Sequence, residues 1–292
     1  MISLNPDLCT NCLECKRICP NYVFGVISKP DTGQEPYIRY PEQCCACGHC
    51  IAVCPSNALS HPELPRDEFV SLSPPCIAPE RMQALLFSRR SIRNYRPDPV
   101  SEELVEMLLA AATHAGTSSN GQTEGFIVIR DRTLLKNLEL LVVDVLWRAG
   151  FKHMGGDGIL GRLLEWKFGP ELVRQYRHYH HIFKHRRENG EIEGVVFRNA
   201  PLVIVAHGLK ANVLAAANCA LALRNIELLA LTMGLGTCWV GFLVGAAARS
   251  KKVGDSIGVA ANQRIWGALM VGYPEEQYHC KLPRKSRQVH WI

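Results

Sequence analysis

The feature that most constrains this chain is a repeated block of cysteines near its N-terminus. The block CTNCLECKRICP begins at Cys9, and the block CCACGHCIAVCP begins at Cys44. Both follow the spacing C-x2-C-x2-C-x3-C-P, so the second block repeats the first position by position. An internal repeat indicates two copies of one structural unit. Any fold of this segment must therefore bring eight regularly spaced thiols to two related places.

This spacing is that of the bacterial iron–sulfur run. Three thiolates in one short loop curl around one iron–sulfur cube, and the fourth cysteine, where the chain turns away, ligates the other cube. Structural zinc also uses C-x2-C pairs, but it takes four ligands, usually as two separated pairs, and fits two dense runs poorly. The predicted ligands are Cys9, Cys12, Cys15 and Cys54 for one [4Fe–4S] cluster and Cys44, Cys47, Cys50 and Cys19 for the other. Cys45 is left over as a non-ligand thiol.

Residues 1–60 therefore resemble a two-cluster bacterial-type ferredoxin. The spacer between the blocks, PDTGQEPYIRY, is expected to form a surface hairpin. A ferredoxin moves single electrons and binds no substrate of its own. The rest of the chain must then use those electrons.

Composition places the chain among soluble globular proteins. It has 292 residues, of which 47% are hydrophobic and 21% charged. A net charge of +6 is too mild to argue for nucleic acid. No apolar run approaches the roughly 20 residues that a bilayer requires, and the start MISLNPDLC lacks the pattern of a secretory signal. We expect a cytoplasmic protein with neither a membrane nor a nucleic-acid partner, whose thiols stay reduced.

The pattern beyond the ferredoxin segment predicts a proline-rich linker at 61–80 and a second domain at 81–292. Helices are expected at 81–90, 101–116, 131–147 and 211–236, with a short helix and turn at 252–260. Strands are expected at 126–130, 201–207, 237–244 and 265–273. Residues 148–198 form an insert or lid of irregular composition, rich in glycine and then in histidine and arginine. This order gives an α+β arrangement. The helix around Val213–Leu231 is apolar on most sides, and a subunit interface would cover it.

Four stretches of the second domain resemble the FMN-dependent nitroreductase family in order and spacing. They are SRRSIRNYRP from Ser88, GTSSNGQ from Gly116, GLGTCWVGF from Gly234 and VGYPEEQYHCKLPRKSR from Val271. The first is also a compact anion site of guanidinium groups and a hydroxyl. The resemblance covers about 81–292, so the whole chain looks like a ferredoxin–nitroreductase fusion. It implies a mixed central sheet flanked by helices, and an obligate homodimer with FMN at the interface.

The resemblance also implies roles for particular residues. The first run would hold the FMN phosphate, the ribityl chain and the N1/O2 side of the ring, and the C-terminal basic residues would complete the phosphate site. The second loop would pack on the flavin from the other subunit. A backbone N–H of Val240 or Gly241 would donate to flavin N5, although enteric members carry an acidic residue at the position of Val240. The implied flavin-binding residues are Arg89, Arg90, Ser91, Arg93, Thr117, Ser118, Asn120, Cys238, Trp239, Val240, Gly241, Arg284, Lys285 and Arg287.

The two halves together predict an oxidoreductase. Clusters pass one electron at a time, and flavin converts single electrons into pairs. The two clusters would relay electrons to FMN, which would reduce a small acceptor: a nitroaromatic, a quinone or an activated double bond. Reduced ferredoxin, a dehydrogenase or NAD(P)H would be the donor. The open alternatives are an electron-transfer component whose flavin serves another protein, and a specialised member such as a reductive dehalogenase or a flavin-consuming enzyme. No side chain is assigned as proton donor, and solvent would supply protons.

Three further features have weaker functional interpretations. Gly156, Gly158 and Gly161 match a dinucleotide-binding pattern but follow no strand, so glycine turns explain them better. A thiol-catalysis role for Cys238 is disfavoured because a small buried residue suffices there. The segment HYHHIFKH offers three histidines on one helical face, more simply a basic lid helix than a metal site. Basic residues of this lid would favour an anionic substrate or an acidic redox partner; they are Arg174, Arg177, Lys184, Arg186 and Arg187.

Overall fold

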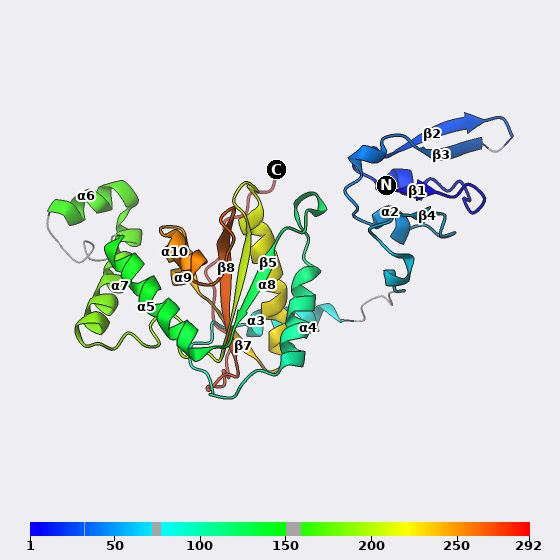
Figure 1. Ribbon diagram of the computed structural model, residues 1–292. Coiled ribbons are helices and arrows are strands. Elements are labelled where there is room, and N and C mark those ends of the chain that lie inside the picture. Colours follow the sequence, from blue (N-terminus) through cyan, green and yellow to red (C-terminus); the bar gives the residue numbers. More distant parts are fainter. Residues whose placement is uncertain (32, 72–76, 150–158) are drawn as a thin grey trace. The chain divides into compact units, whose positions relative to one another are not determined.

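The chain forms two compact units. The computed structural model describes residues 1–31, 33–71, 77–149 and 159–292 (Figure 1). The first unit spans Met1–Cys76 together with Thr117–Gln122, and the second spans Ile77–Gly116 together with Thr123–Ile292. Part of the expected linker, 72–76, and the glycines Gly156 and Gly158 lie outside the described residues.

The first unit is built from two antiparallel strand pairs and short helical turns. Strand β1 (Ser3–Leu4) pairs with β4 (Leu59–Ser60), and β2 (Phe24–Lys29) pairs with β3 (Gly33–Ile38). The latter pair is the hairpin expected between the cysteine blocks. The helical segments are α1 (Glu14–Ile18), η1 (Pro41–Gln43), α2 (His49–Ala52), η2 (Arg66–Glu68) and η3 (Ser118–Asn120).

The second unit is centred on a four-stranded sheet of order β5-β6-β8-β7. All three pairings between these strands are antiparallel. At the β7 edge, Ser91 forms a parallel β-bridge with Thr237, so the sheet also contains a parallel contact. The strands are β5 (Gly125–Ile129), β6 (Leu202–Leu209), β7 (Gly236–Trp239) and β8 (Gln263–Gly272).

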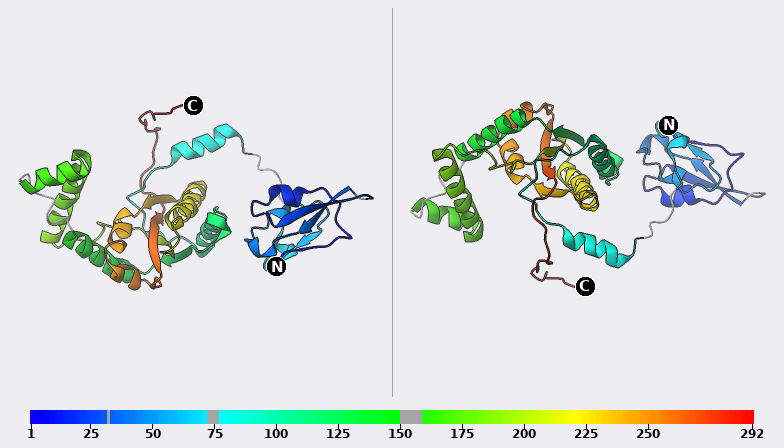
Figure 2. Two further views of the ribbon diagram at one scale, coloured as in Figure 1. Left: turned by 90° about the horizontal axis from the view of Figure 1, so that it is seen from above. Right: turned by 90° about the horizontal axis from the view of Figure 1, so that it is seen from below.

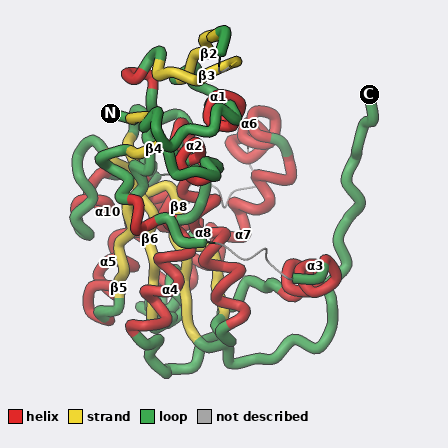
Figure 3. Tube along the Cα trace, turned by 90° about the vertical axis from the view of Figure 1, so that its right-hand side faces the viewer, coloured by secondary structure: helices red, strands yellow, loops and turns green. Residues whose placement is uncertain are grey.

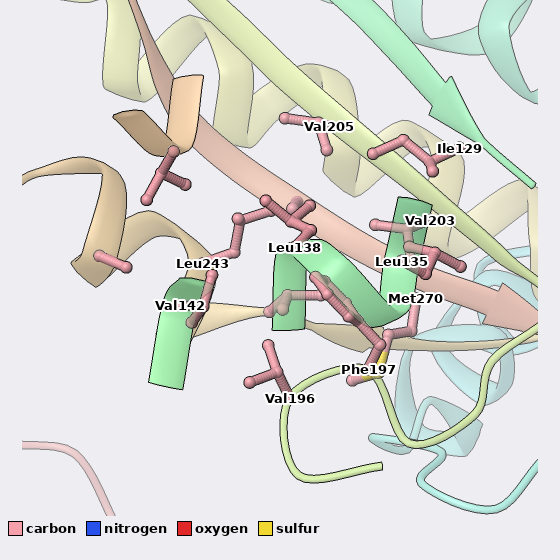
Figure 4. Close-up of a cluster of buried hydrophobic side chains, with 14 of the residues drawn as sticks. Ile129, Leu135, Leu138, Val142, Val196, Phe197, Val203, Val205, Leu243 and Met270 are labelled. Carbon is pink, nitrogen blue, oxygen red and sulfur yellow. The ribbon is translucent and has the colours of Figure 1, made fainter. Parts of the chain in front are cut away.

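Helices cover both faces of this sheet, which explains why β6 is apolar along most of its length. On one face α4 and α8 pack on Leu202, Ile204 and Ala206, and on the other α5 and α9 pack near Val203 and Val205 (Figure 3). Figure 4 shows side chains of α5 meeting those of β6 and β8 in the second of these cores. The helices are α3 (Pro79–Ser88), α4 (Glu102–Thr113), α5 (Arg132–Arg148), α6 (Ile159–Phe168), α7 (Pro170–Glu188), α8 (Ala215–Thr232), α9 (Gly241–Ala247) and α10 (Lys251–Asp255).

The expected helix starts follow from N-terminal caps. The Ser101 hydroxyl accepts the N–H of Leu104, and the Asp131 carboxylate accepts the N–H of Leu134 at 2.6 Å. Each cap satisfies one of the donors that the first turn leaves unpaired. These caps fix where α4 and α5 begin.

One expectation for the second unit is wrong. The strand predicted at 237–244 ends at Trp239, because Gly241 already begins helix α9. Within the insert at 148–198, helix α7 contains the segment HYHHIFKH that was expected to be a lid helix, and helix α6 precedes it. Among the described residues, no helix has the length and apolarity that a bilayer crossing needs.

Helix α3 and the C-terminal segment after β8 both extend away from the sheet (Figure 2), and they meet near the end of α3. The Arg90 guanidinium donates to the carbonyl of Cys280 at 2.9 Å, and the Lys281 ammonium lies over the ring of Phe87. Helix α3 buries no residue, and Trp291 in the tail is 94% exposed. Apolar side chains on both segments therefore lack a cover within the described chain.

A buried carboxylate organises the segment that precedes β6. The Glu139 carboxylate, on α5, accepts the backbone N–H groups of Gly194, Val196 and Phe197. Because Glu139 is buried, its loss would leave these donors without partners in an apolar core.

We expect Glu139→Leu to lower the free energy of unfolding by roughly 2–4 kcal/mol, since two buried donors and one half-buried donor lose their acceptor. Glu139→Gln keeps one acceptor oxygen and should cost less. Urea denaturation followed by circular dichroism measures both, with Glu193→Gln, at an exposed ion pair, as control. A Leu variant as stable as the control would contradict the organising role of Glu139.

Candidate active site

The structure brings the eight repeated cysteines together in the two predicted sets. Each set lines its own hollow in the first unit, and each draws three thiols from one block and one from the other. The crossing of the fourth cysteine follows from the chain turning away after α1 and after α2. The sets are Cys9, Cys12, Cys15 and Cys54 around one hollow, and Cys19, Cys44, Cys47 and Cys50 around the other, whose lining also includes Cys45.

Left-handed residues curl the two cysteine loops. Asn11 and Leu13 have φ of 58° and 62° in the first loop, and Ala46 and Gly48 have φ of 48° and 73° in the second. A left-handed residue between consecutive cysteines reverses the chain locally and is costly for a residue with a Cβ. The repeat in sequence is thus also a repeat in backbone conformation.

The pKa shifts of the thiols are consistent with the same two sets of four cysteines. Burial, with a smaller contribution from charge on Cys9, Cys12 and Cys54, raises the pKa of Cys15 to about 11. Burial, with a smaller contribution from Cys47, Cys44 and Cys19, raises the pKa of Cys50 to about 12. Thiolates packed this closely repel one another, so the donor set calls for positive metal at its centre.

Cys54 differs from the other ligands. Burial would raise its pKa, but hydrogen bonds from the Ala58 N–H and from Ser56 outweigh burial and lower it. Hydrogen bonds to a ligating sulfur are among the factors that tune an iron–sulfur potential. The two thiol sets are therefore not equivalent electrostatically.

The second unit contains a cavity of about 1070 Å³ beside the end of β7. Its walls come from α7, α9, the segment that precedes β6 and the arginine run after α3. Arg93, Cys238, Trp239, Val240 and Gly241 all lie on it, so five predicted flavin-binding residues meet in one place. Pockets of several hundred Å³ are typical for cofactors and small ligands.

Backbone pairing holds the two predicted runs together. The Ile92 N–H donates to the Thr237 carbonyl at 2.9 Å, next to the Ser91–Thr237 bridge. The Val240 N–H donates to the Ala268 carbonyl at 2.9 Å and is therefore already used. Gly241 is the first residue of α9, where a helix leaves its N–H groups without intrahelical acceptors. Of the two backbone donors considered for flavin N5, the structure favours Gly241.

The remaining residues of the arginine run have structural partners. Arg89 forms an ion pair of 3.6 Å with Glu227, which also pairs with Arg224 at 3.2 Å. Arg90 is buried and donates to the carbonyls of Phe87 and Cys280. Arg90 thereby ties the C-terminal segment to the end of α3.

Two predicted groups are not among the residues that line this cavity. Thr117, Ser118 and Asn120 belong to the first unit, where the Asn120 amide donates to the carbonyls of Cys45 and Ala46 at 3.3 and 3.2 Å. The C-terminal basic residues lie in an exposed segment without regular structure and do not line the cavity. Their flavin roles stay predictions; these residues are Arg284, Lys285 and Arg287.

Sequence reasoning missed two arginines of the cavity, Arg198 and Arg249. Arg198 precedes β6 and belongs to no basic run, whereas Arg249 follows α9 and begins the basic stretch RSKK. For Arg198, only the fold reveals that the residue lies at the cavity. The wall also contains three α7 histidines, His178, His181 and His185.

No three His, Cys, Asp or Glu side chains of the described ranges are placed to hold a single metal ion. The α7 histidines are thus part of the cavity wall. The thiol sets are a different case, because four sulfurs around a hollow suit a multi-iron cube instead of one ion.

Cys238 lies on the cavity but is a poor nucleophile. Burial raises the pKa of its thiol, although Arg93 and Ser91 act in the opposite direction. The thiolate is the reactive form of cysteine, so a raised pKa disfavours covalent chemistry. A packing role for Cys238 fits these observations.

Comparisons with known proteins agree with the two units. A model of the nitroreductase family matches residues 86–273, and a model of the 4Fe-4S dicluster domain matches residues 8–59. A protein of Archaeoglobus fulgidus, provisionally named an NADH dehydrogenase/NAD(P)H nitroreductase, is 24% identical over 198 residues. That match covers 68% of this chain and 88% of the relative.

Solved structures share the fold of the second unit. A nitroreductase with bound FMN from Bacteroides fragilis has a TM-score of 0.53 and 20% identity, covering 72% of this chain and 97% of that one. A nitroreductase with bound FMN from Desulfitobacterium hafniense has a TM-score of 0.51 and 19% identity, covering 71% and 97%. At these identities the likeness concerns the fold alone.

We expect iodoacetamide at pH 8 to alkylate Cys280 at least about tenfold faster than Cys238, since Cys280 is exposed and burial raises the pKa of Cys238. Peptide mass spectrometry after timed labelling measures the two rates, and labelling in urea, where the rates should converge, is the control. Equal alkylation rates in the folded protein would contradict the interpretation that the Cys238 thiol is buried and neutral.

Proposed function

The chain belongs to the nitroreductase family and carries a 4Fe-4S dicluster domain before the family segment, and from that premise we propose that it is an FMN-dependent oxidoreductase. In this proposal two [4Fe–4S] clusters relay single electrons to FMN. The flavin site reduces a small organic acceptor, such as a nitroaromatic, a quinone or an activated double bond, by two electrons. The observation that carries the proposal is the meeting of five predicted flavin-binding residues on one large cavity.

The first unit fits two clusters by its donor chemistry. Soft thiolates in sets of four are the ligands of iron–sulfur clusters. Each set surrounds a hollow, and the mutual repulsion that raises the pKa of Cys15 and Cys50 would be offset by iron. Cys45 would stay a non-ligand neighbour.

The second unit fits FMN by size, charge and hydrogen bonding. The cavity of about 1070 Å³ has room for a flavin with an acceptor beside it, Arg93 supplies a cation, and Gly241 supplies a backbone donor. FMN, when bound, can take up electrons singly and give them up in pairs. Ser91 and Arg89 lie on the same run as Arg93 and would orient the ribityl phosphate.

The chain's own groups would position and protect the reaction. Val240, Leu146 and Met270 line the cavity with apolar surface, which excludes water from the reacting groups. The Arg93 guanidinium favours the reduced, anionic form of a flavin beside it. The Tyr95 hydroxyl donates to the Ile92 carbonyl at 2.7 Å, and burial raises its pKa, so Tyr95 is a poor proton donor. Protons would come from solvent.

We infer a homodimer with FMN at the interface. The exposed apolar side chains of α3 and of the C-terminal segment support it, as does Leu221 on α8, which is 53% exposed. A second copy of the chain would cover these surfaces and complete the phosphate site with Arg284, Lys285 and Arg287. Reduced ferredoxin, a dehydrogenase or NAD(P)H would be the electron donor.

The alternative is an electron-transfer component whose flavin serves another protein. A wide cavity beside the predicted flavin run favours an enzyme with its own acceptor, because a component of that kind needs no substrate pocket. The two possibilities differ in whether small acceptors are turned over.

Anaerobically purified protein should contain about eight iron atoms and one FMN per chain, four irons for each cluster. Stepwise addition of a one-electron reductant should change the cluster and flavin absorption bands in exchange with one another. Turnover of a nitroaromatic by the reduced protein would support the enzyme over the component. Clusters without FMN would overturn the proposal.

A matched pair of variants distinguishes a predicted cluster ligand, Cys12, from the predicted non-ligand thiol, Cys45. Cys12→Ser should lose between about one and four irons and the electron paramagnetic resonance signal of one cluster, since Cys12 is an exposed thiol of the first set. Cys45→Ser should keep the wild-type iron content. Equal iron loss in both variants would sink the ligand assignment.

A further inference from the structure

The cavity of the second unit carries a concentration of positive charge that the flavin run does not account for. Besides Arg93, three guanidinium groups line it, and none of the described residues on its wall is Asp or Glu. The three arginines come from different elements: Arg186 from α7, Arg198 from the segment before β6, and Arg249 from the residues after α9. Their convergence is a property of the fold and not of a basic stretch of sequence.

The structure holds the backbone of Arg198 and the guanidinium of Arg249 in place. Arg198 has a φ of 52° and Asn199 a φ of 54°, a left-handed pair of residues that a free chain would avoid. The Glu139 carboxylate binds the preceding N–H groups, and the Arg132 guanidinium donates to the Asn199 carbonyl at 2.9 Å. The Arg249 guanidinium donates to the Gly245 carbonyl at 2.8 Å. A fixed guanidinium loses little freedom when it binds an anion.

The lid helix sorts its basic residues into two groups. Arg186 faces the cavity, with an exposed ion pair of 3.5 Å to Glu191. Arg177 instead pairs with Glu165 at 3.0 Å, and the Arg187 guanidinium stacks over Trp147. The remaining two, Arg174 and Lys184, do not line the cavity. Only one of the five basic residues singled out on the lid is therefore directed to the site.

Beside this charge the cavity offers an apolar and aromatic surface. Phe242, on α9, contacts the ring of Tyr179 edge-on at 5.0 Å, and Ile182 and Leu146 lie on the same wall. A ligand that matches both surfaces has an anionic group on a flat or apolar body. We propose that the acceptor is an organic anion whose carboxylate or phosphate binds Arg198 and Arg249, with Arg186 at the lid.

This inference rests on the proposed function, because it names the class of acceptor for the same cavity. The FMN phosphate is also an anion, so the experiment must distinguish an anionic acceptor from the cofactor as the ligand of these arginines. An acidic redox partner is a third ligand that would fit a basic wall. The experiment gives a different result for each of these three ligands.

The test compares 4-nitrobenzoate with 4-nitrobenzamide, its neutral analogue, using the FMN-loaded wild type and the variants Arg198→Gln and Arg249→Gln. Reduced methyl viologen, a cation, is the donor, so the donor does not compete for the site. Two one-electron equivalents and two protons convert the nitro group to nitroso and water. Binding of benzoate and benzamide, which are not reduced, is measured separately by calorimetry.

We expect each variant to raise the KM for 4-nitrobenzoate roughly 10- to 100-fold, as loss of a charge-assisted hydrogen bond implies. The KM for 4-nitrobenzamide should change less than about twofold, and FMN per chain should stay constant. Benzoate affinity should fall in parallel. Arg174→Gln, on the lid but off the cavity, should behave as wild type.

Equal KM changes for both acceptors would overturn the anion site. Loss of FMN in the variants would assign the arginines to the cofactor phosphate and also overturn it. A defect seen with a protein donor but not with viologen would assign the wall to a redox partner instead. If wild type reduces neither acceptor but binds benzoate over benzamide through Arg249, the anion site stands and the proposed activity fails.

Discussion

The candidate site depends on the pairing of β8 with β7. Strand β8 lies between β6 and β7, and its register with β7 sets Cys238 opposite Met270 and Trp239 opposite Leu269. The ladder continues for one residue past β7, because the Val240 N–H binds the Ala268 carbonyl. That last bond directs the chain into α9 and leaves Gly241 at the helix start. On its other side Thr237 receives the Ile92 N–H, which brings the arginine run to the same place. A shift of one residue in this register would reverse the faces of β7 and dismantle the cavity wall.

Much of this could be predicted from the sequence where local chemistry decides the outcome. The cysteine spacing specified which thiols would gather, since ligation imposes geometry that few other constraints can change. Ser101 and Asp131 marked the starts of α4 and α5, because capping depends on residues only three apart. The hairpin between the cysteine blocks followed from its turn signals. In each case the deciding interaction lies within a few residues along the chain.

The errors arose where tertiary contacts decide. The apolar run after Trp239 has no feature that separates a strand from a short buried helix, and packing of Leu243 and Ala246 selects the helix. Helix α6 was not predicted, because the sequence around it is rich in glycine, whereas the lid helix α7 was predicted. Arg198 gave no signal at all, because its left-handed backbone is imposed by Glu139 and Arg132, both distant in sequence. The use of Arg90 to hold the C-terminal segment was equally invisible, since the two ends meet only in the fold.

The two units solve opposite electrostatic problems. The first gathers groups that become negative: its buried core is small, and its packed thiols raise one another's pKa, so it is completed by cationic metal. The second gathers fixed positive charge around an apolar cavity with no acidic group among its described lining residues. Guanidinium groups do not lose their charge under physiological conditions, so proton loss cannot relieve this repulsion. Within the described part of the chain, Arg186 pairs with Glu191, whereas Arg198 and Arg249 have no acidic partner. An anionic ligand would therefore stabilise these two guanidinium groups most, and a flavin phosphate beside Arg93 would leave both of them to bind the acceptor.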